Sequence, residues 1–480
     1  MRKLITFFIL LRSVVLHAQQ ITPDEAAAIA SEFLSSSSPQ LTTAKRVGVK
    51  RAKAKSDAAD DLARPYYVFN GDNNQGFVIV SGDKRAKKIL GYSDTGTFDF
   101  DNLPPQLAAI LEQYAEQIKS LPESTTTDPS WGTPTRTAST GEGKLLETAN
   151  WGQGYPYNAL TPEIDGQHAP TGCVATAMAI IIKYHNWPEQ GRSFSDFIGE
   201  GTIQHLEFSQ FSFNYDLMPL SMPEEPNESS AKALSELMLA AGRSVNMSYG
   251  TIESGAYFEI VAHQLQEKFS YSPECEFLMS KYYNWDEWEA IIKSEIDKNQ
   301  PVLYSGSSES SKHAFICDGY KENYFHINWG WDGLTNGYFN LSEIMYSLSP
   351  SMVINIVPDK SGTEYARPYL ANDGFYTLFK EVNFINVSVP DIKTGVKFDI
   401  NSPTIRTPYE FNGDLGFALV DRDNNIKEVF TSESRYNSGD IFNEYGYDGG
   451  CSKLGVVIES EIEPDDRLQL VAREINKLVG

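Results

Sequence analysis

One segment, Gly172–Gly191, constrains the fold more than any other part of this sequence. After Cys173 comes the run Val174–Ile182, in which only Thr176 is polar. A helix that is apolar on every side has to be buried, so the run predicts a central helix that begins at Cys173. A thiol in the first helical turn meets unpaired backbone N–H groups and the positive end of the helix dipole, and both favour the nucleophilic thiolate. Cys173 is therefore a candidate nucleophile, and the alternative is a core helix with an inert cysteine.

The charge and the N-terminus of the chain restrict its partners and its location. The formal net charge is −24 over 480 residues, and binding to nucleic acid phosphates needs a basic face. We therefore expect no nucleic acid partner. Residues 1–18 combine a basic start, a short apolar run and a small residue at the end, which is typical of a secretory signal peptide. No later segment approaches the ~20 apolar residues of a membrane-spanning helix, so the sequence predicts a secreted protein with no membrane span.

Residue patterns divide the rest of the chain into four parts. Residues 19–121 mix helical and strand periodicity and predict a small α+β domain. Residues 122–144 are rich in Ser, Thr, Gly and Pro, which indicates a linker that proteases can cut. Residues 145–358 predict a second compact domain. Residues 361–480 carry short strand patterns between turn signals, and these predict an immunoglobulin-like β-sandwich.

The chain has four cysteines, which in a secreted protein can indicate disulfides. Cys275, Cys317 and Cys451 are far apart in the sequence, and a chain of this length does not need covalent staples. We interpret these three as buried apolar residues.

A cysteine nucleophile needs a base, and histidine is the side chain that titrates near neutral pH. Of the seven histidines, His313 begins a strand pattern that ends at Tyr320 and follows a loop of small and polar residues. A strand end beside a loop can present a ring to substrate. His313 lies 313 − 173 = 140 residues after Cys173, within the ~130–150 that papain-type enzymes use. His168, just before Cys173, stays open as an alternative, and His326 is interpreted as structural.

The other ring nitrogen of the base needs a partner that fixes its tautomer. The strand patterns at 313–320 and 324–331 are separated by a short polar gap and predict an antiparallel hairpin. We expect this hairpin to bring His313 beside Asn328 and Trp329. The Asn328 amide oxygen could accept the imidazole N–H, and the Trp329 indole could cover the pair. Both assignments stay open.

Acyl transfer also needs donors for a developing oxyanion. Gln153 lies between Gly152 and Gly154, upstream of Cys173, where its amide could point N–H at the reacting carbonyl. The backbone N–H of Cys173 would be the second donor.

Several motifs now stand in one order along the chain. They are Trp-Gly-Gln at 151–153, Gly-Cys-Val-Ala-Thr-Ala at 172–177, His-Ala-Phe at 313–315 and Asn-Trp-Gly-Trp at 328–331. Together they resemble the streptopain family of secreted bacterial cysteine proteases. The Trp-Gly-Gln segment looks like that family's oxyanion segment, and the strand patterns at 66–83 are similar to its inhibitory propeptide. The resemblance covers residues 22–358.

The resemblance implies an α+β, papain-like catalytic domain with a helical lobe and a β-sheet lobe. It also implies an inhibitory prodomain at 19–121, and therefore an endopeptidase made as a zymogen, with a preference for an apolar residue at P2. Cys173 would be the nucleophile, His313 the general acid and base, and Gln153 an oxyanion donor. No metal or organic cofactor is expected, and the partners are protein or peptide substrates and the protein's own prodomain. The C-terminal β-rich part resembles extra domains of large bacterial relatives.

Two other functions are consistent with parts of the sequence. A secreted binding or adhesion protein could carry a degenerate protease core, but one of Gln153, Cys173, His313 and Asn328 would then be expected to be missing, and all four are present. A transpeptidase would use the same thiol and transfer the acyl group to an amine. The mass of the product distinguishes the two reactions.

Overall fold

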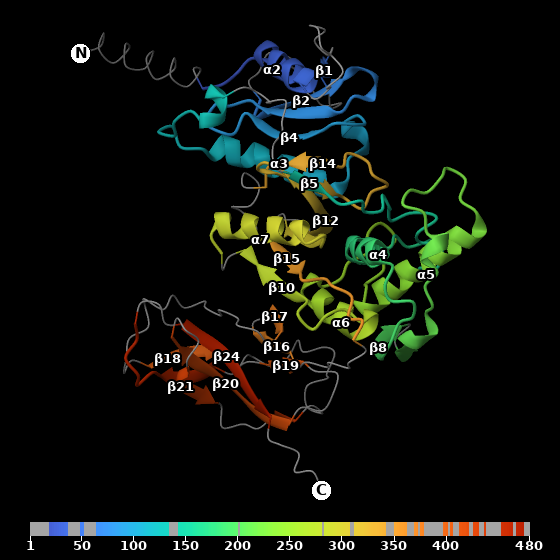
Figure 1. Ribbon diagram of the computed structural model, residues 1–480, viewed down its shortest axis with the longest axis vertical. Coiled ribbons are helices and arrows are strands. Elements are labelled where there is room, and N and C mark those ends of the chain that lie inside the picture. Colours follow the sequence, from blue (N-terminus) through green and yellow to red (C-terminus); the bar gives the residue numbers. More distant parts are fainter. Residues whose placement is uncertain are drawn as a thin grey trace. The chain divides into compact units, whose positions relative to one another are not determined.

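Figure 1 shows a computed structural model of the chain. It describes residues 19–36, 49–51, 64–133, 143–199, 202–280, 283–307, 312–341 and 350–361, and shorter segments between 369 and 474. The predicted signal peptide, 1–18, lies outside the described residues. The chain divides into two compact units, Met1–Phe258 with Leu278–Ile354, and Glu259–Phe277 with Asn355–Gly480. The predicted α+β domain and most of the predicted catalytic domain therefore fall in one unit.

The N-terminal region combines helices and strands, as the mixed periodicity of residues 19–121 predicts. Its elements are α2 (Pro23–Ser36), β1 (Val49–Arg51), β2 (Tyr66–Gly71), β3 (Phe77–Ser81), β4 (Ile89–Ser93) and α3 (Pro105–Ser120). A reciprocal capping box starts α2: the Glu25 N–H donates to Thr22 Oγ1 at 3.2 Å, and the Thr22 N–H donates to Glu25 Oε2 at 2.8 Å. One face of the β2–β3–β4 sheet packs on α2 through Phe33, whose ring lies 4.9 Å from the ring of Tyr92.

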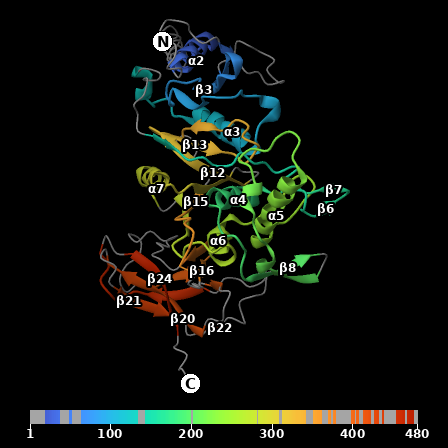
Figure 2. The same cartoon turned by 45° about the vertical axis from the view of Figure 1, so that its right-hand side comes forward.

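The second part of this unit contains three longer helices and most of the strands. The helices are α4 (Cys173–His185), α5 (Glu228–Ser244) and α7 (Trp285–Asp297). Helix α4 lies beside α5 (Figure 2). The strands are β5 (Gly143–Leu145), β6 (Glu163–Ile164), β7 (Gln167–His168), β8 (Phe194–Gly199), β9 (Thr202–Glu207), β10 (Glu276–Met279), β11 (Val302–Ser307), β12 (Lys312–Lys321), β13 (Tyr324–Asn328), β14 (Gly337–Phe339) and β15 (Ser351–Ile354).

One sheet runs through both parts of this unit, in the order β1-β2-β3-β4-β14-β13-β12-β11-β15. The junction is the antiparallel pair β4–β14, in which Tyr92 is opposite Tyr338 and Gly91 is opposite Phe339 (Figure 1). A Cβ at Gly91 would lie only 2.6 Å from Phe339 Cδ1, so glycine lets the two strands approach.

Helix α3 joins the same two parts through its buried face. The Tyr114 hydroxyl donates to Leu90 O at 2.7 Å and to Asn340 O at 3.0 Å, which lie on opposite sides of the junction. The Gln106 side chain, 2% exposed, donates from Nε2 to Trp329 O at 3.3 Å. A single hydrophobic core spans both parts, and it includes Phe77, Leu107, Leu111, Trp288, Phe315, Phe325, Trp329 and Phe339.

Much of the predicted linker, 122–144, is ordered against neighbouring structure. The short 3-10 helix Pro129–Gly132 is held to the N-terminal region, since the Trp131 indole donates to Ala86 O at 2.9 Å. The buried Lys88 ammonium donates to Thr133 O at 2.7 Å. At the other end β5 pairs with β12, Gly143 opposite Lys321. The described ends of this segment are therefore anchored by backbone carbonyls and strand pairing, which composition does not report.

The second unit contains α6 (Val261–Phe269) and the C-terminal strands β16 (Tyr369–Asn372), β17 (Phe375–Leu378), β18 (Lys397–Asn401), β19 (Thr404–Arg406), β20 (Asn412–Val420), β21 (Ile426–Thr431), β22 (Tyr436–Asn437), β23 (Lys453–Val457) and β24 (Arg467–Glu474). Strand β20 pairs with β21, β22 and β24, and β18 pairs with β23. The β-rich character matches the sequence expectation, and the immunoglobulin-like sandwich stays a prediction. Within the described residues, no helix has the length and apolar character needed to cross a membrane.

Candidate active site

Cys173 is the first residue of α4, as the sequence predicts, and a glycine places it there. The N-cap, Gly172, has φ +86°, a left-handed conformation that L side chains rarely adopt. A Cβ on Gly172 would lie 2.7 Å from Met247 Sδ and 2.9 Å from Ser254 O. The start of α4 is therefore packed so closely against the loop around Met247 and Ser254 that only glycine fits.

The surroundings of the thiol combine burial with backbone donors. Burial raises the pKa of the Cys173 thiol, while the backbone N–H groups of Ala314, Val174 and Cys173 itself lower it. The net direction is upward, so the helix terminus does not outweigh burial in this state of the protein. Because the Ala314 N–H faces the thiol, the thiol lies beside the start of strand β12, next to His313.

His313 occupies the second position of β12, opposite Gly306 of β11. Burial lowers the pKa of its half-buried ring, and the nearby negative charge of Glu253 raises it in part. The same charge contributes to the raised pKa of Cys173. Both groups are thus favoured in their neutral forms, as a thiol and an imidazole. The structure brings the segments that carry Cys173 and His313 together, as the sequence predicts.

Asn328 lies in the predicted hairpin but is used differently from the expectation. It pairs with Ile316, not His313. Its Nδ2 donates to Thr148 Oγ1 at 3.0 Å and to Ala149 O at 2.9 Å, and its Oδ1 accepts from the Gly330 N–H at 3.1 Å. In this structure the amide therefore fixes the loop after β13, and the partnership with His313 stays a prediction.

Trp329 is fully buried in the core that the two parts of the unit share. Its ring lies 5.3 Å from Phe315 and 5.1 Å from Phe339, and its indole donates to Thr335 O at 2.9 Å. Phe315 is two residues after His313 on β12. Trp329 thus packs beneath the strand that carries His313, which is compatible with a supporting role for the base.

Gln153 lies in a segment that is tied to the start of α4, where Cys173 lies. Its carbonyl accepts the Thr171 N–H at 3.1 Å, two residues before Cys173. Thr171 Oγ1 in turn lies 2.7 Å from Thr176 Oγ1 on the first turn of α4. The backbone of Gln153 and the start of α4 therefore share hydrogen bonds, which suits two groups that have to act on one carbonyl.

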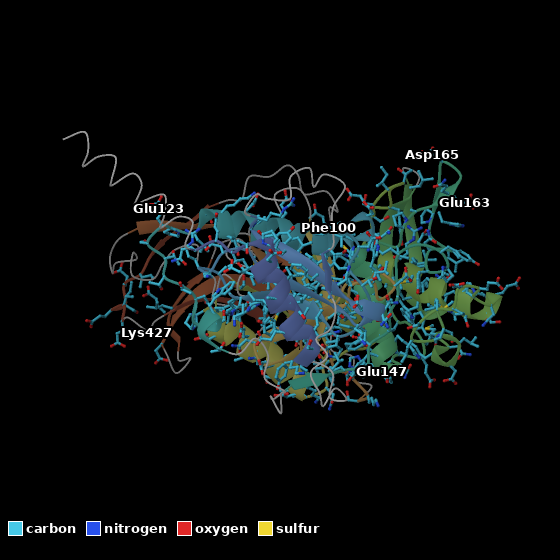
Figure 3. All side chains as sticks on the ribbon, turned by 90° about the horizontal axis from the view of Figure 1, so that it is seen from above. Phe100, Glu123, Glu147, Glu163, Asp165 and Lys427 are labelled. Atoms are coloured by element: carbon cyan, nitrogen blue, oxygen red, sulfur yellow. The ribbon has the colours of Figure 1, made fainter. Side chains whose placement is uncertain are left out.

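His168, the alternative base, is engaged elsewhere. Its Nδ1 lies 2.7 Å from Thr161 O, and its Nε2 lies 3.5 Å from a carboxylate oxygen of Glu163. His168 and Glu163 belong to the β6–β7 hairpin, whose turn contains Asp165. Figure 3 labels Glu163 and Asp165 at this edge of the molecule.

Two side chains near the site were not identified from the sequence. Asp318 is buried and accepts from Thr148 Oγ1, and it pairs with His326 Nδ1 at 2.5 Å. This pairing supports the structural interpretation of His326. Asp332 lies in the loop after Trp331 and contacts the oxyanion segment at Gly152. The only sequence signal for Asp332 is its place next to Gly333 directly after the Asn-Trp-Gly-Trp motif. Cys275 and Cys317 are buried, as the sequence predicts, and Cys451 lies outside the described residues.

Comparison with known proteins places this geometry in a family. A model of the Peptidase C10 family matches residues 151–339, and a model of the Spi protease inhibitor matches residues 18–118. Streptopain of Streptococcus pyogenes is 37% identical over 300 residues, which are 58% of this chain and 74% of streptopain. The chain belongs to the Peptidase C10 family of cysteine peptidases. Its N-terminal region is an inhibitor-like prodomain of the Spi type.

Two other relatives support the assignment. The thiol protease/hemagglutinin PrtT of Porphyromonas gingivalis is 30% identical over 432 residues, which are 82% of this chain. The chain spans about half the length of that relative, 49%. A solved fragment of Prevotella intermedia prointerpain A, a cysteine-to-alanine mutant, matches with a TM-score of 0.54 and 26% identity, over 65% of this chain and 99% of the fragment. The papain-like fold with a prodomain is therefore confirmed.

Proposed function

We propose that this C10 peptidase is a secreted endopeptidase made as a zymogen, with Cys173 as nucleophile and His313 as general acid and base. The observation that carries the proposal is the thiol at the start of α4 beside the N–H of Ala314, the residue that follows His313. A thiol in contact with backbone donors and next to an imidazole-bearing strand is the arrangement that nucleophilic cysteine catalysis needs.

The proposed reaction is hydrolysis through an acyl-enzyme. His313 takes the thiol proton, and the Cys173 sulfur attacks the scissile carbonyl carbon. The Gln153 amide and the Cys173 N–H stabilise the oxyanion. The His313 imidazolium then gives its proton to the amine as the C–N bond breaks. Water, deprotonated by His313, attacks the thioester and releases the acid and the thiol.

The attached prodomain fits an inactive state. The neutral thiol and imidazole are the unreactive forms of the pair, because the thiolate is the nucleophile. Helix α3 of the prodomain reaches the protease through Gln106 and Tyr114, and it shares a core with Trp329. We infer that release of the prodomain changes the burial of the pair and allows the thiolate–imidazolium form.

Labelling with a peptidyl epoxide tests the nucleophile. Processed enzyme should lose activity as one label appears on Cys173, located by peptide mapping, and Cys173→Ala should take up no label. Cys317→Ala is the matched control: Cys317 is a buried free thiol on the strand that carries His313, and its loss should leave labelling unchanged. Label on Cys317 or Cys275 in place of Cys173 would overturn the assignment.

Two further experiments address the rest of the proposal. The mass of the product from a peptide substrate should show addition of water across one bond, whereas a ligated product would indicate a transpeptidase. For secretion, expression of the full chain in a bacterial host should place protein that lacks the segment before about residue 19 outside the cytoplasm.

A further inference from the structure

The carboxylate of Asp332 lies directly against the backbone of Gly152, the residue before Gln153. A Cβ on Gly152 would collide with Asp332 Oδ2 and would lie 2.8 Å from Oδ1. A glycine at 152 is thus what allows the carboxylate to come this close. The side chain occupies the space beside the oxyanion segment that any other residue at 152 would fill.

The backbone of Asp332 holds the same segment from a second point. Its N–H donates to Trp151 O at 3.1 Å, and its φ of +52° is left-handed, a conformation that aspartate and asparagine tolerate better than most residues. Thr171 holds the segment at its other end by donating to Gln153 O. Residues 151–153 are therefore fixed between the loop after β13 and the start of α4.

The buried phenol of Tyr157 faces the same carboxylate. Tyr157 is 1% exposed, and its hydroxyl has no hydrogen-bond partner at bonding distance among the described residues. The charge that acts on the Tyr157 hydroxyl is that of the Asp332 carboxylate, and the N–H of Gly152 also faces the hydroxyl oxygen. Burial and the Asp332 charge raise the pKa of Tyr157, so the phenol keeps its proton and can donate to the carboxylate.

We propose that Asp332 is a positioning residue for the oxyanion hole, which acts on Gln153 through Gly152 and Tyr157. The inference rests on the proposed function and adds a residue to it. A donor amide has to be fixed near 3 Å from the oxyanion, and a shift of about 1 Å at an active site can lower the rate about 100-fold. The carboxylate limits the movement of Gly152, and the Tyr157 hydroxyl faces the carboxylate and is placed to donate to it when the two come into bonding distance.

Two substitutions distinguish the effect of the Asp332 carboxylate from the effect of the turn conformation at position 332. Asp332→Asn keeps the shape and tolerates the left-handed backbone, and Asp332→Gly removes the side chain while it keeps the backbone free to turn. If Asp332 only shapes the loop, both variants behave as wild type. Asp165→Asn is the matched control, because Asp165 is an exposed turn aspartate with the same φ of +52° on the β6–β7 hairpin (Figure 3).

The test uses processed enzyme, a peptide substrate and iodoacetamide as a probe of the thiol. In Asp332→Gly we expect kcat to fall about 10- to 100-fold with KM within about threefold of wild type, since the donor acts in the transition state. Asp332→Asn keeps the bulk against Gly152 and an acceptor oxygen, so its kcat should fall less. The rate of Cys173 alkylation by iodoacetamide should stay within about twofold, because alkylation forms no oxyanion. Asp165→Asn should leave all three values unchanged.

Three results would overturn the inference. Wild-type kcat in both Asp332 variants would remove the role, and an equal loss of alkylation would show that the variants damage the nucleophile instead. If the Asp332 variants do not fold, Tyr157→Phe has to show the same selective loss of kcat, and a wild-type kcat there contradicts the proposal. A wild-type enzyme that neither hydrolyses peptides nor alkylates at Cys173 would contradict the proposed function itself.

Discussion

The ring of Tyr92 stacks on the ring of Tyr338, with centroids 5.1 Å apart, and the two residues face each other across strands β4 and β14. Tyr92 belongs to the prodomain and Tyr338 to the protease. The prodomain is thus attached by strand addition, in which backbone pairing supplies affinity and side chains supply specificity.

Substitution at this junction should speed the activation of the zymogen. In Gly91→Ala the new methyl group would lie 2.6 Å from Phe339 Cδ1, and overpacking of this kind costs about 1–3 kcal/mol. We expect the prodomain to be released more readily and the full chain to be processed several times faster. Gel electrophoresis over time measures the rate of processing. Gly132→Ala, at a linker glycine with open space around its Cβ position, is the control. Equal processing rates for the two variants would argue against the junction as the point of control.

The Tyr114 hydroxyl should contribute to the same attachment. Tyr114→Phe removes the bonds to Leu90 O and Asn340 O, and a buried hydrogen bond contributes about 1 kcal/mol. We expect a lower free energy of unfolding for the full chain and faster processing. Tyr184→Phe also removes a tyrosine–carbonyl bond, to Asn299 O, but both of its partners belong to the protease. A Tyr114→Phe chain that is processed no faster than Tyr184→Phe would contradict the expectation.

The reactivity of Cys173 should depend on pH in a way that reports activation. Burial raises the thiol pKa in the full chain, so less thiolate is present at neutral pH and alkylation should reach half its maximum rate above the usual pH of about 8.5. After processing, pairing with His313 should move that midpoint to lower pH. Mass spectrometry after iodoacetamide treatment measures it, and an identical midpoint before and after processing would exclude the proposed change of state.

The activation cut should fall after Thr133 and before Gly143. Thr133 is bonded to Lys88, and Gly143 pairs with Lys321, so both flanks are held by neighbouring structure. Proteases need a chain that can leave its hydrogen bonds. The N-terminus of the processed enzyme, read by mass spectrometry, should lie in that interval, also for Cys173→Ala cut by added active enzyme. A first cut between 122 and 132 would contradict this prediction.

The positions of Cys173 and His313 in the fold were predictable because each is marked by a local pattern. Cys173 follows a glycine and starts an apolar helix, and His313 starts a strand. Asn328 could not be placed as easily. Strand β12 begins before the part that pairs with β13, so the end of β13 meets Ile316 and not the start of β12 at His313. The bulge between Cys317 and Gly319 changes this register by only one residue, and the unequal strand lengths are not visible in the sequence pattern.

Long-range contacts account for the other differences from the sequence analysis. Nothing near Asp332 in the sequence indicates that its carboxylate meets Gly152, because the contact joins positions far apart in the chain. The anchoring of residues 129–133 also depends on Lys88 and Ala86, while composition reports only a polar segment. Glu259–Phe277 falls in the same compact unit as the C-terminal strands, and this too depends on contacts between residues far apart in the sequence.

The sheet that passes through prodomain and protease has a consequence for the mature enzyme. Once the prodomain leaves, β14 loses its neighbour β4 and becomes an outer strand with unpaired backbone groups, open to any extended chain. The strand has only three residues, Gly337–Phe339, and short outer strands are one means by which proteins resist self-association. The same shortness that makes the inhibitor removable therefore protects the free enzyme from aggregation.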